Sequence, residues 1–135
     1  MAAVLALGAE AVIMGTRLMM TQECPIHAKL KQALCDASEL DTLLIMRSLR
    51  ATHRVWDNAA ARKCQEIERT KGDFDEVLSV VTGDKARKIY DEGDLEIGVV
   101  SAGQGLGLIH DIPTVKVLFD RIMDHAEHTM TRLVK

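Results

Sequence analysis

The sequence predicts an α/β fold that is mostly helical as it stands. The apolar run Ala11–Met14 ends abruptly in Gly15-Thr16, which is typical of a short strand buried on both faces, as in a parallel sheet. At the other end of the chain, apolar residues recur every three or four positions after Pro113, as in an amphipathic helix. Both features fit within the 135 residues of a single domain.

The first residues are predicted to form a helix that leads into the buried strand. Met1–Leu7 is rich in Ala and Leu and is followed by Gly8, a common helix C-cap. No N-cap residue precedes Met1, and a parallel strand at Ala11–Met14 needs neighbouring strands that the rest of the sequence does not supply. We therefore expect the chain to be part of a longer protein.

The turn after this strand is a candidate phosphate site. Glycine at position 15 lets the backbone approach a ligand closely, and the helical pattern of the following residues, Thr16–Met20, would direct free N–H groups at it. In a (β/α)8 barrel the corresponding place, on the rim after the last strands, commonly binds phosphate groups. On periodicity alone, a core strand that ends in an ordinary turn explains the pattern more simply.

The middle of the chain alternates helices with one further strand. A loop from Thr21 leads into a helix with Pro25 near its first turn. The compact apolar run Thr42–Met46 favours a strand, and a charged helix is expected over Thr52–Thr70. The apolar positions of the first of these helices are Ile26, Leu30, Ala33 and Leu34.

Glycines divide the second half into shorter elements. Gly72 should end the charged helix, and short helices should follow over Phe74–Val81 and, after Gly83, from a cap at Asp84 to Tyr90. A short strand over Ile97–Val100 should precede a glycine cluster. The final helix should begin near Pro113, with Asp111 as its cap and an apolar stripe of Val115, Leu118, Phe119, Ile122, Ala126, Met130 and Leu133.

Composition and charge exclude several classes of function. A net charge of −3 without a basic stripe argues against nucleic-acid binding, and an aromatic content of 3% leaves no stacking platform for single strands. No apolar stretch reaches the roughly 20 residues that span a bilayer, and Met1–Leu7 lacks the positive flank of a signal peptide. We expect a cytoplasmic protein without a membrane or nucleic-acid partner.

The metal and thiol patterns favour structural roles. Cys24, Cys35 and Cys64 have neither a disulfide nor a zinc spacing and are expected to stay reduced. His125 and His128 share the spacing of some helical metal sites, but no further ligand is evident, so we expect a solvated face and no metal.

Two other clusters admit a chemical interpretation. Gly103-Gln-Gly105-Leu-Gly107 after a strand resembles a dinucleotide fingerprint, but Leu108 stands where Gly or Ala is required. A glycine-rich packing turn and a binding loop are equally good explanations of it. The acidic cluster of Asp91, Glu92 and Asp94 is typical of a solvated turn.

Several motifs occur together in one order along almost the whole chain. They are Ala6–Arg17, Glu23-Cys-Pro25, His27, Glu92-Gly-Asp94, Ser101–Gln104, Gly107–Ile109 and Asp111-Ile-Pro113. In this combination they resemble the C-terminal part of the nitronate monooxygenase (2-nitropropane dioxygenase) family. The resemblance implies the last two-fifths or so of an FMN-binding (β/α)8 TIM barrel.

The resemblance also implies a division of the chain. Residues 1–20 would be the end of the barrel, namely the end of helix 7 and strand 8 with its phosphate-binding turn. Residues 21–96 would be a mainly helical insertion on the substrate side. Residues 97–135 would be a rim loop and the closing C-terminal helix.

The resembled family oxidises alkyl nitronates with O2 to carbonyl compounds and nitrite. Carried over to this chain, Met14, Gly15 and Thr16 would hold the FMN phosphate, while Ser101 and Gln104 would lie near the flavin and the substrate. The family often has Gln at the position of Ile13. Its catalytic histidine and ring contacts lie upstream, so we assign no catalytic residue here and expect the chain alone to be inactive.

Two other classes remain open. FMN-dependent enoyl-acyl-carrier-protein reductases resemble this chain in the same region, including an Ala-Gly-Gln loop at Ala102–Gln104. Alternatively, the chain could be a non-catalytic helical module that forms homo-oligomers or docks to a partner through the uncovered strand at Ala11–Met14.

Overall fold

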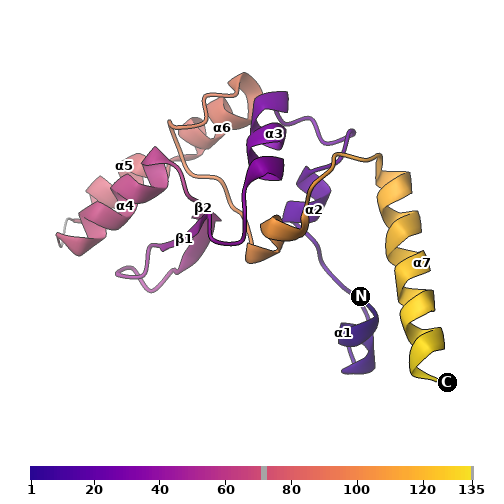
Figure 1. Cartoon of the computed structure of the whole chain (residues 1–135). Helices are drawn as coiled ribbons and strands as arrows, with labels where there is room; N and C mark the ends of the chain where they lie inside the picture. The colour runs from indigo at the N-terminus through magenta and orange to yellow at the C-terminus, as the bar shows by residue number, and fades with distance from the viewer. Residues whose placement is uncertain (71–72, 135) are drawn as a thin grey trace.

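The computed structural model describes residues 1–70 and 73–134 and shows a mixed α/β chain that is mostly helical (Figure 1). In chain order its elements are α1 (Ala2–Ala6), α2 (Thr16–Met19), α3 (Ala28–Asp36), β1 (Thr42–Ile45), β2 (His53–Trp56), α4 (Ala59–Arg69), α5 (Phe74–Val80), α6 (Gly83–Glu92), the 3-10 helix η1 (Gln104–Leu108) and α7 (Val115–Leu133).

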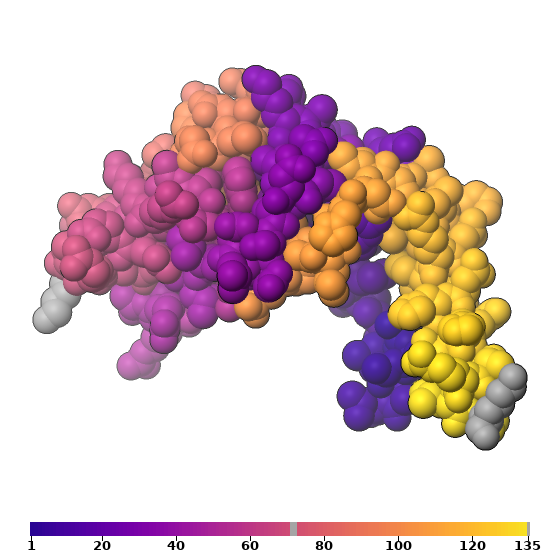
Figure 2. Space-filling model, viewed as in Figure 1, coloured from indigo at the N-terminus to yellow at the C-terminus, as the bar shows by residue number. Residues whose placement is uncertain are grey.

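The molecule consists of a body and an arm. The body contains the elements from α2 to η1, whereas the arm is formed by α1, residues 9–14 and α7. The far half of α7 lies beside α1, away from the body, and Figure 2 shows the arm projecting from one side of the molecule. No helix in the described ranges has the length and hydropathy needed to cross a bilayer.

Two clusters of buried side chains form the core of the body. One joins α3, α6, η1 and the segment before η1, and the other joins the strands to α4 and α5. The first contains Met20, Leu30, Leu34, Ile89, Val100, Ala102, Leu106 and Ile109. The second contains Ile45, Val55, Ala60, Ala61, Cys64, Val77 and Val80.

The predicted strand at residues 42–46 is confirmed, but its partner was predicted as helix. β1 pairs antiparallel with β2, from Thr42 opposite Trp56 to Ile45 opposite His53. The expected helix over Thr52–Thr70 was therefore wrong in its first part, because His53–Trp56 joins the sheet and buries Val55. The helix starts only after Asn58, whose side chain accepts a hydrogen bond from Ala61 N–H at 2.9 Å.

The expected buried strand at Ala11–Met14 is not formed in this chain. These residues have no strand partner in the described ranges, and Ile13 is 99% exposed. A strand buried on both faces needs neighbours on each side, and here the only ladder among the described residues is β1–β2.

The expected strand at Ile97–Val100 is also absent as a regular element. Instead, the chain runs beside β2 at the next residues, where Val55 and Ser101 form an isolated antiparallel bridge. Trp56 N–H donates to Val100 O at 2.8 Å, and Ala102 N–H donates to Arg54 O at 3.3 Å.

The other helices were predicted close to their true limits, but their caps differ. α3 begins after His27, well past Pro25, and α7 is capped by Thr114, which accepts from Val117 N–H at 3.2 Å. Neither Asp84 nor Asp111 is a cap: the first lies within α6, and the second forms ion pairs.

The helix end expected at Gly72 lies outside the described residues. Of the stripe predicted on α7, only Leu118 and Ala126 are buried.

Candidate functional site

A hollow of about 370 Å³ separates the turn after residue 13 from the glycine-rich loop. Its walls are the turn Met14–Arg17 on one side and the loop Gly103–Ile109 on the other. The lining residues are Met14, Gly15, Thr16, Arg17, Gly103, Gly105, Leu108 and Ile109. All three predicted cofactor residues therefore line one cavity, together with a loop almost ninety positions further along the chain.

Glycine keeps this hollow open on both sides. A methyl group added to Gly15 or Gly105 would meet no atom within 4 Å, so both faces leave room for a ligand. The turn is tied to the loop by one hydrogen bond, in which Gly103 N–H donates to Thr16 Oγ1 at 3.0 Å. The turn and the loop therefore form one linked unit.

A cluster of charges lies beside the hollow. Arg17 donates to Asp111 through Nη2 at 2.8 Å, and through Nη1 to the carbonyl of the same residue at 3.1 Å. Arg121 of α7 pairs with the second carboxylate oxygen. The Arg121 and Arg17 guanidinium groups lower the pKa of Asp111, so the cluster carries a net positive charge at neutral pH.

The two predicted substrate residues lie next to the hollow rather than in its wall. Gln104 is exposed at the start of η1, and Ser101 is exposed on the segment that runs beside β2. Ser101 Oγ is 2.9 Å from Nε2 of His53. His53 is isolated in the sequence, because its partner is 48 positions away and no local spacing indicates such a contact.

The remaining histidines have structural or solvated positions. Nδ1 of His27 accepts from Lys29 N–H at 3.2 Å and so caps α3. The same imidazole packs directly against Gly93, whose φ of 72° ends α6. His125 and His128 are exposed on α7, and no group of potential metal ligands is found in the described part of the chain.

The cysteines are free thiols. Burial raises the pKa of Cys64 and of Cys35, in the latter case against the opposing effect of Arg17. Both thiols are therefore protonated at neutral pH, which is unfavourable for a nucleophile.

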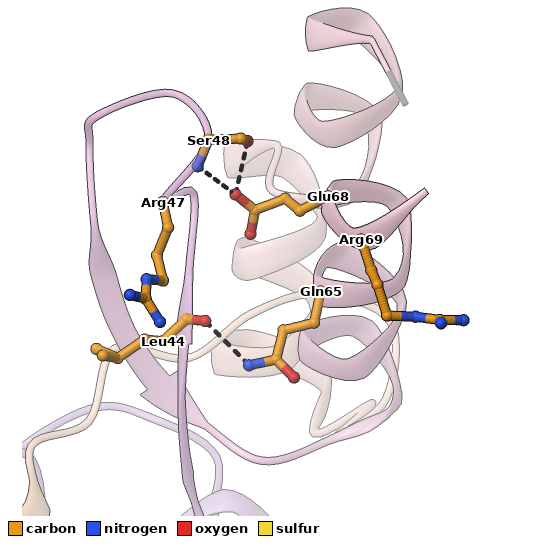
Figure 3. A pocket seen from close by; sticks show the side chains of 6 residues that line it. All are labelled: Leu44, Arg47, Ser48, Gln65, Glu68 and Arg69. Atoms are coloured by element: carbon orange, nitrogen blue, oxygen red, sulfur yellow. Dashed lines mark hydrogen bonds between the residues drawn. The ribbon is translucent and has the colours of Figure 1, made fainter. Parts of the chain in front are cut away.

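A second hollow, of about 410 Å³, lies between the β1–β2 hairpin and α4 (Figure 3). Its polar groups hold the hairpin in place: Glu68 accepts from Ser48 N–H at 2.8 Å and from its hydroxyl at 2.7 Å, and Gln65 donates to Leu44 O at 3.0 Å. Arg69 points away from the hollow and pairs with Glu66. The arrangement braces a turn and leaves no converging set of groups for a ligand.

A glycine turn and a glycine-rich loop thus face each other across one hollow, beside a cluster of net positive charge, on a mixed α/β chain. Comparison with known proteins identifies the family of the chain. The model of the family described as nitronate monooxygenase matches residues 1–125, so the chain belongs to that family. The family comprises FMN-dependent oxidoreductases.

Solved structures and a curated relative support the assignment. FabK from Thermotoga maritima matches with a TM-score of 0.89 at 36% identity, over 98% of this chain and 42% of FabK. A point mutant of the same FabK matches with a TM-score of 0.79 at 34% identity, over 98% of this chain and 38% of the mutant. The (3aS,4S,5R,7aS)-5-hydroxy-7a-methyl-1-oxo-octahydro-1H-indene-4-carboxyl-CoA dehydrogenase of Rhodococcus jostii (strain RHA1) is 28% identical, over 93% of this chain and 46% of the relative.

The chain thus spans less than half the length of each of these relatives.

Proposed function

We propose that this chain is the C-terminal portion of an FMN-dependent oxidoreductase, in which Met14, Gly15 and Thr16 hold the phosphate of FMN. The observation that carries the proposal is the hollow between this turn and the glycine loop, at the place where the family resemblance puts the phosphate. In the described structure the backbone N–H groups of Thr16 and Arg17 have no acceptor, so they are free to bind an anion.

The residues present fit the phosphate end of the cofactor. Open glycines at positions 15 and 105, the Thr16 hydroxyl and the nearby Arg17 guanidinium suit a phosphate. FMN, when bound, would supply the electron transfer. The family resemblance puts the contacts to its ring, and the catalytic histidine, in a segment that this chain does not match. The residues described here hold one end of the cofactor.

The reaction that we propose for the longer protein is the oxidation of alkyl nitronates by O2 to carbonyl compounds and nitrite. A nitronate is an anion whose charge lies on its oxygens. The Ser101 hydroxyl and the Gln104 amide are exposed hydrogen-bond donors beside the hollow and suit such oxygens. Their role would be to orient the substrate, while His53 holds Ser101.

Reduction of an enoyl thioester of acyl carrier protein is the second candidate. Two observations favour it: the Ala102–Gln104 loop that FMN-dependent enoyl-acyl-carrier-protein reductases share, and the match to FabK at 36% identity. The products distinguish the two reactions, because only nitronate oxidation releases nitrite.

Exposed apolar side chains on the arm support the view that further chain covers this portion. Leu7 is 88% exposed, and Ile13, Met130 and Leu133 are also largely exposed. We propose that the rest of the barrel packs on these side chains, with Ala11–Met14 paired as its last strand. In the alternative, non-catalytic reading these side chains would join copies of the chain, and light scattering after size-exclusion chromatography would then show an oligomer.

The test compares the chain with the longer protein. We expect the 135-residue chain alone to lose FMN on purification and to release no nitrite from propionate 3-nitronate, whereas the longer protein should retain FMN and release nitrite. Consumption of an enoyl thioester without nitrite release would favour the second candidate. Tight flavin retention and nitrite release by the chain alone would contradict the proposal.

A further inference from the structure

We propose that the Thr16 hydroxyl is a relay that positions the substrate loop, residues 100–104, when a phosphate binds at the neighbouring turn. The inference rests on the phosphate role proposed above for Gly15 and Thr16. It assigns to Thr16 a second task, which is to make the position of Ser101 and Gln104 depend on whether the phosphate turn is occupied.

The first support is the hydrogen bonding of Thr16 itself. Its Oγ1 accepts from Gly103 N–H at 3.0 Å, and among the described residues nothing accepts its own proton. A hydroxyl can accept and donate at the same time. A phosphate oxygen at the turn would take the free proton, and the increased negative charge on Oγ1 would strengthen the bond from Gly103, because linked hydrogen bonds polarise one another.

The second support is how the two ends of the substrate loop are held. Its first half is attached to β2: Trp56 N–H donates to Val100 O, and His53 contacts Ser101. At the other end, the Gly103 amide is bonded only to Thr16 within the described structure. The neighbouring bonds, from Ala102 N–H to Arg54 O and from Leu106 N–H to Gly103 O, stay within the loop and β2. The bond from Gly103 N–H is therefore the one that links this end of the loop to the phosphate turn among the described residues.

Three variants separate the relay from simple packing. Thr16→Val keeps the shape of the side chain but removes the hydroxyl, whereas Thr16→Ser keeps the hydroxyl. Gly103→Ala is the control for the loop, because its Cβ would lie 3.8 Å from Thr16 Oγ1, an ordinary contact, and its N–H would remain.

The experiment follows backbone amide signals of the full 135-residue chain by NMR. In the absence of ligand, hydrogen exchange at Gly103 should be slow in the wild type and in Thr16→Ser, and roughly tenfold faster in Thr16→Val. Inorganic phosphate is then added, with sodium chloride at equal ionic strength as the control. The amide chemical shifts of positions 15, 16 and 103 should change together in the wild type, in Thr16→Ser and in Gly103→Ala. In Thr16→Val, the chemical shift of position 103 should not change.

The outcomes distinguish the relay from the phosphate site. Shifts at Gly15 and Thr16 without a shift at Gly103 would overturn the relay and leave the phosphate site standing. A Gly103 shift that persists in Thr16→Val would also overturn the relay. If phosphate moved none of these signals, both the relay and the proposed phosphate site would be contradicted.

Discussion

The arm is more apolar in sequence than the body, yet it buries fewer of its residues. In the body, helices and strands converge from several directions, so residues such as Leu34 and Ile45 are completely buried. In the arm, α1 buries no residue, and α7 buries only Leu118 and Ala126. The difference shows that an apolar stripe becomes a core only where other elements meet it, and the arm has an open face.

The largest expected effect tests this contrast directly. Leu34→Ala should lower the free energy of unfolding by about 2–5 kcal/mol, because it leaves a cavity in a fully buried cluster. Met130→Ala on the arm, where the side chain is 60% exposed, should change it by no more than about 0.5 kcal/mol. Urea denaturation of both variants measures the difference, and equal losses would remove the distinction between body and arm.

A smaller effect is expected where α4 braces the hairpin of the body. Glu68 accepts from Met46 N–H at 2.8 Å as well as from Ser48, so Glu68→Ala should lower the free energy of unfolding by about 1.5–3 kcal/mol. Chemical denaturation at neutral pH measures it. A loss as small as that of Met130→Ala would show that the brace does not stabilise the body.

The Glu68 carboxylate should also make the stability of the body depend on pH. Burial tends to raise the pKa of Glu68, but hydrogen bonds from Ser48 and from the backbone outweigh it and lower the pKa overall. The contribution to stability is therefore present above the unfolded pKa of about 4.3 and is lost as the pH falls through the folded value. Glu68→Gln should remove this part of the acid sensitivity, and an unchanged pH profile would contradict the assignment.

Gly93, at the end of α6, is a position in the body where only glycine fits. Its φ of 72° strains any other residue, and a Cβ there would overlap the imidazole of His27 that caps α3. Gly93→Ala should therefore cost about 1–2 kcal/mol. Gly105→Ala, which meets open space, is the matched control and should be nearly neutral in thermal unfolding. Equal melting temperatures for the two variants would contradict the close packing of His27 against Gly93.

The smallest effect is expected at the joint between body and arm. Asp111 pairs with Arg17 of the body and Arg121 of the arm, but its side chain is half exposed, so Asp111→Asn should cost only about 0–1 kcal/mol. Because the pKa of Asp111 is lowered in the folded protein, its contribution is lost as the pH falls through that value. Added salt should lower the free energy of unfolding of the wild type more than that of Asp111→Asn. If Asp111→Asn still lost much stability relative to the wild type at high salt, the joint would not be held mainly by these ion pairs.

Periodicity predicted most of the elements of the body but not how they meet. Helices such as α5 and the strand at Thr42–Ile45 show a local pattern, so the sequence indicates them directly. β2 was missed because the turn before it contains no glycine. Met46 and Arg50 take positive φ there, and the local sequence gives no sign of this. The exposure of Ala11–Met14 depends on strands that a local pattern cannot supply.

The candidate site was predictable to a similar extent. The turn Met14–Thr16 and the glycine loop carry recognisable motifs, so the sequence pointed to both. Their facing arrangement across one hollow, the bond from Gly103 to Thr16 and the contact of His53 with Ser101 all link distant positions. Such contacts depend on the folded chain rather than on spacing along it.

The central claim is that Gly15 lies against a phosphate of FMN, and flavin content tests it most directly. Gly15 has a φ of −97° and open space around it, so Gly15→Val should leave the fold intact while filling the place of the phosphate. Absorbance of the purified longer protein should show about one FMN per chain in the wild type and almost none in Gly15→Val. Gly83→Ala, which also meets open space but lies outside the hollow, is the control and should keep its FMN. Full flavin content in a folded Gly15→Val protein would contradict the account.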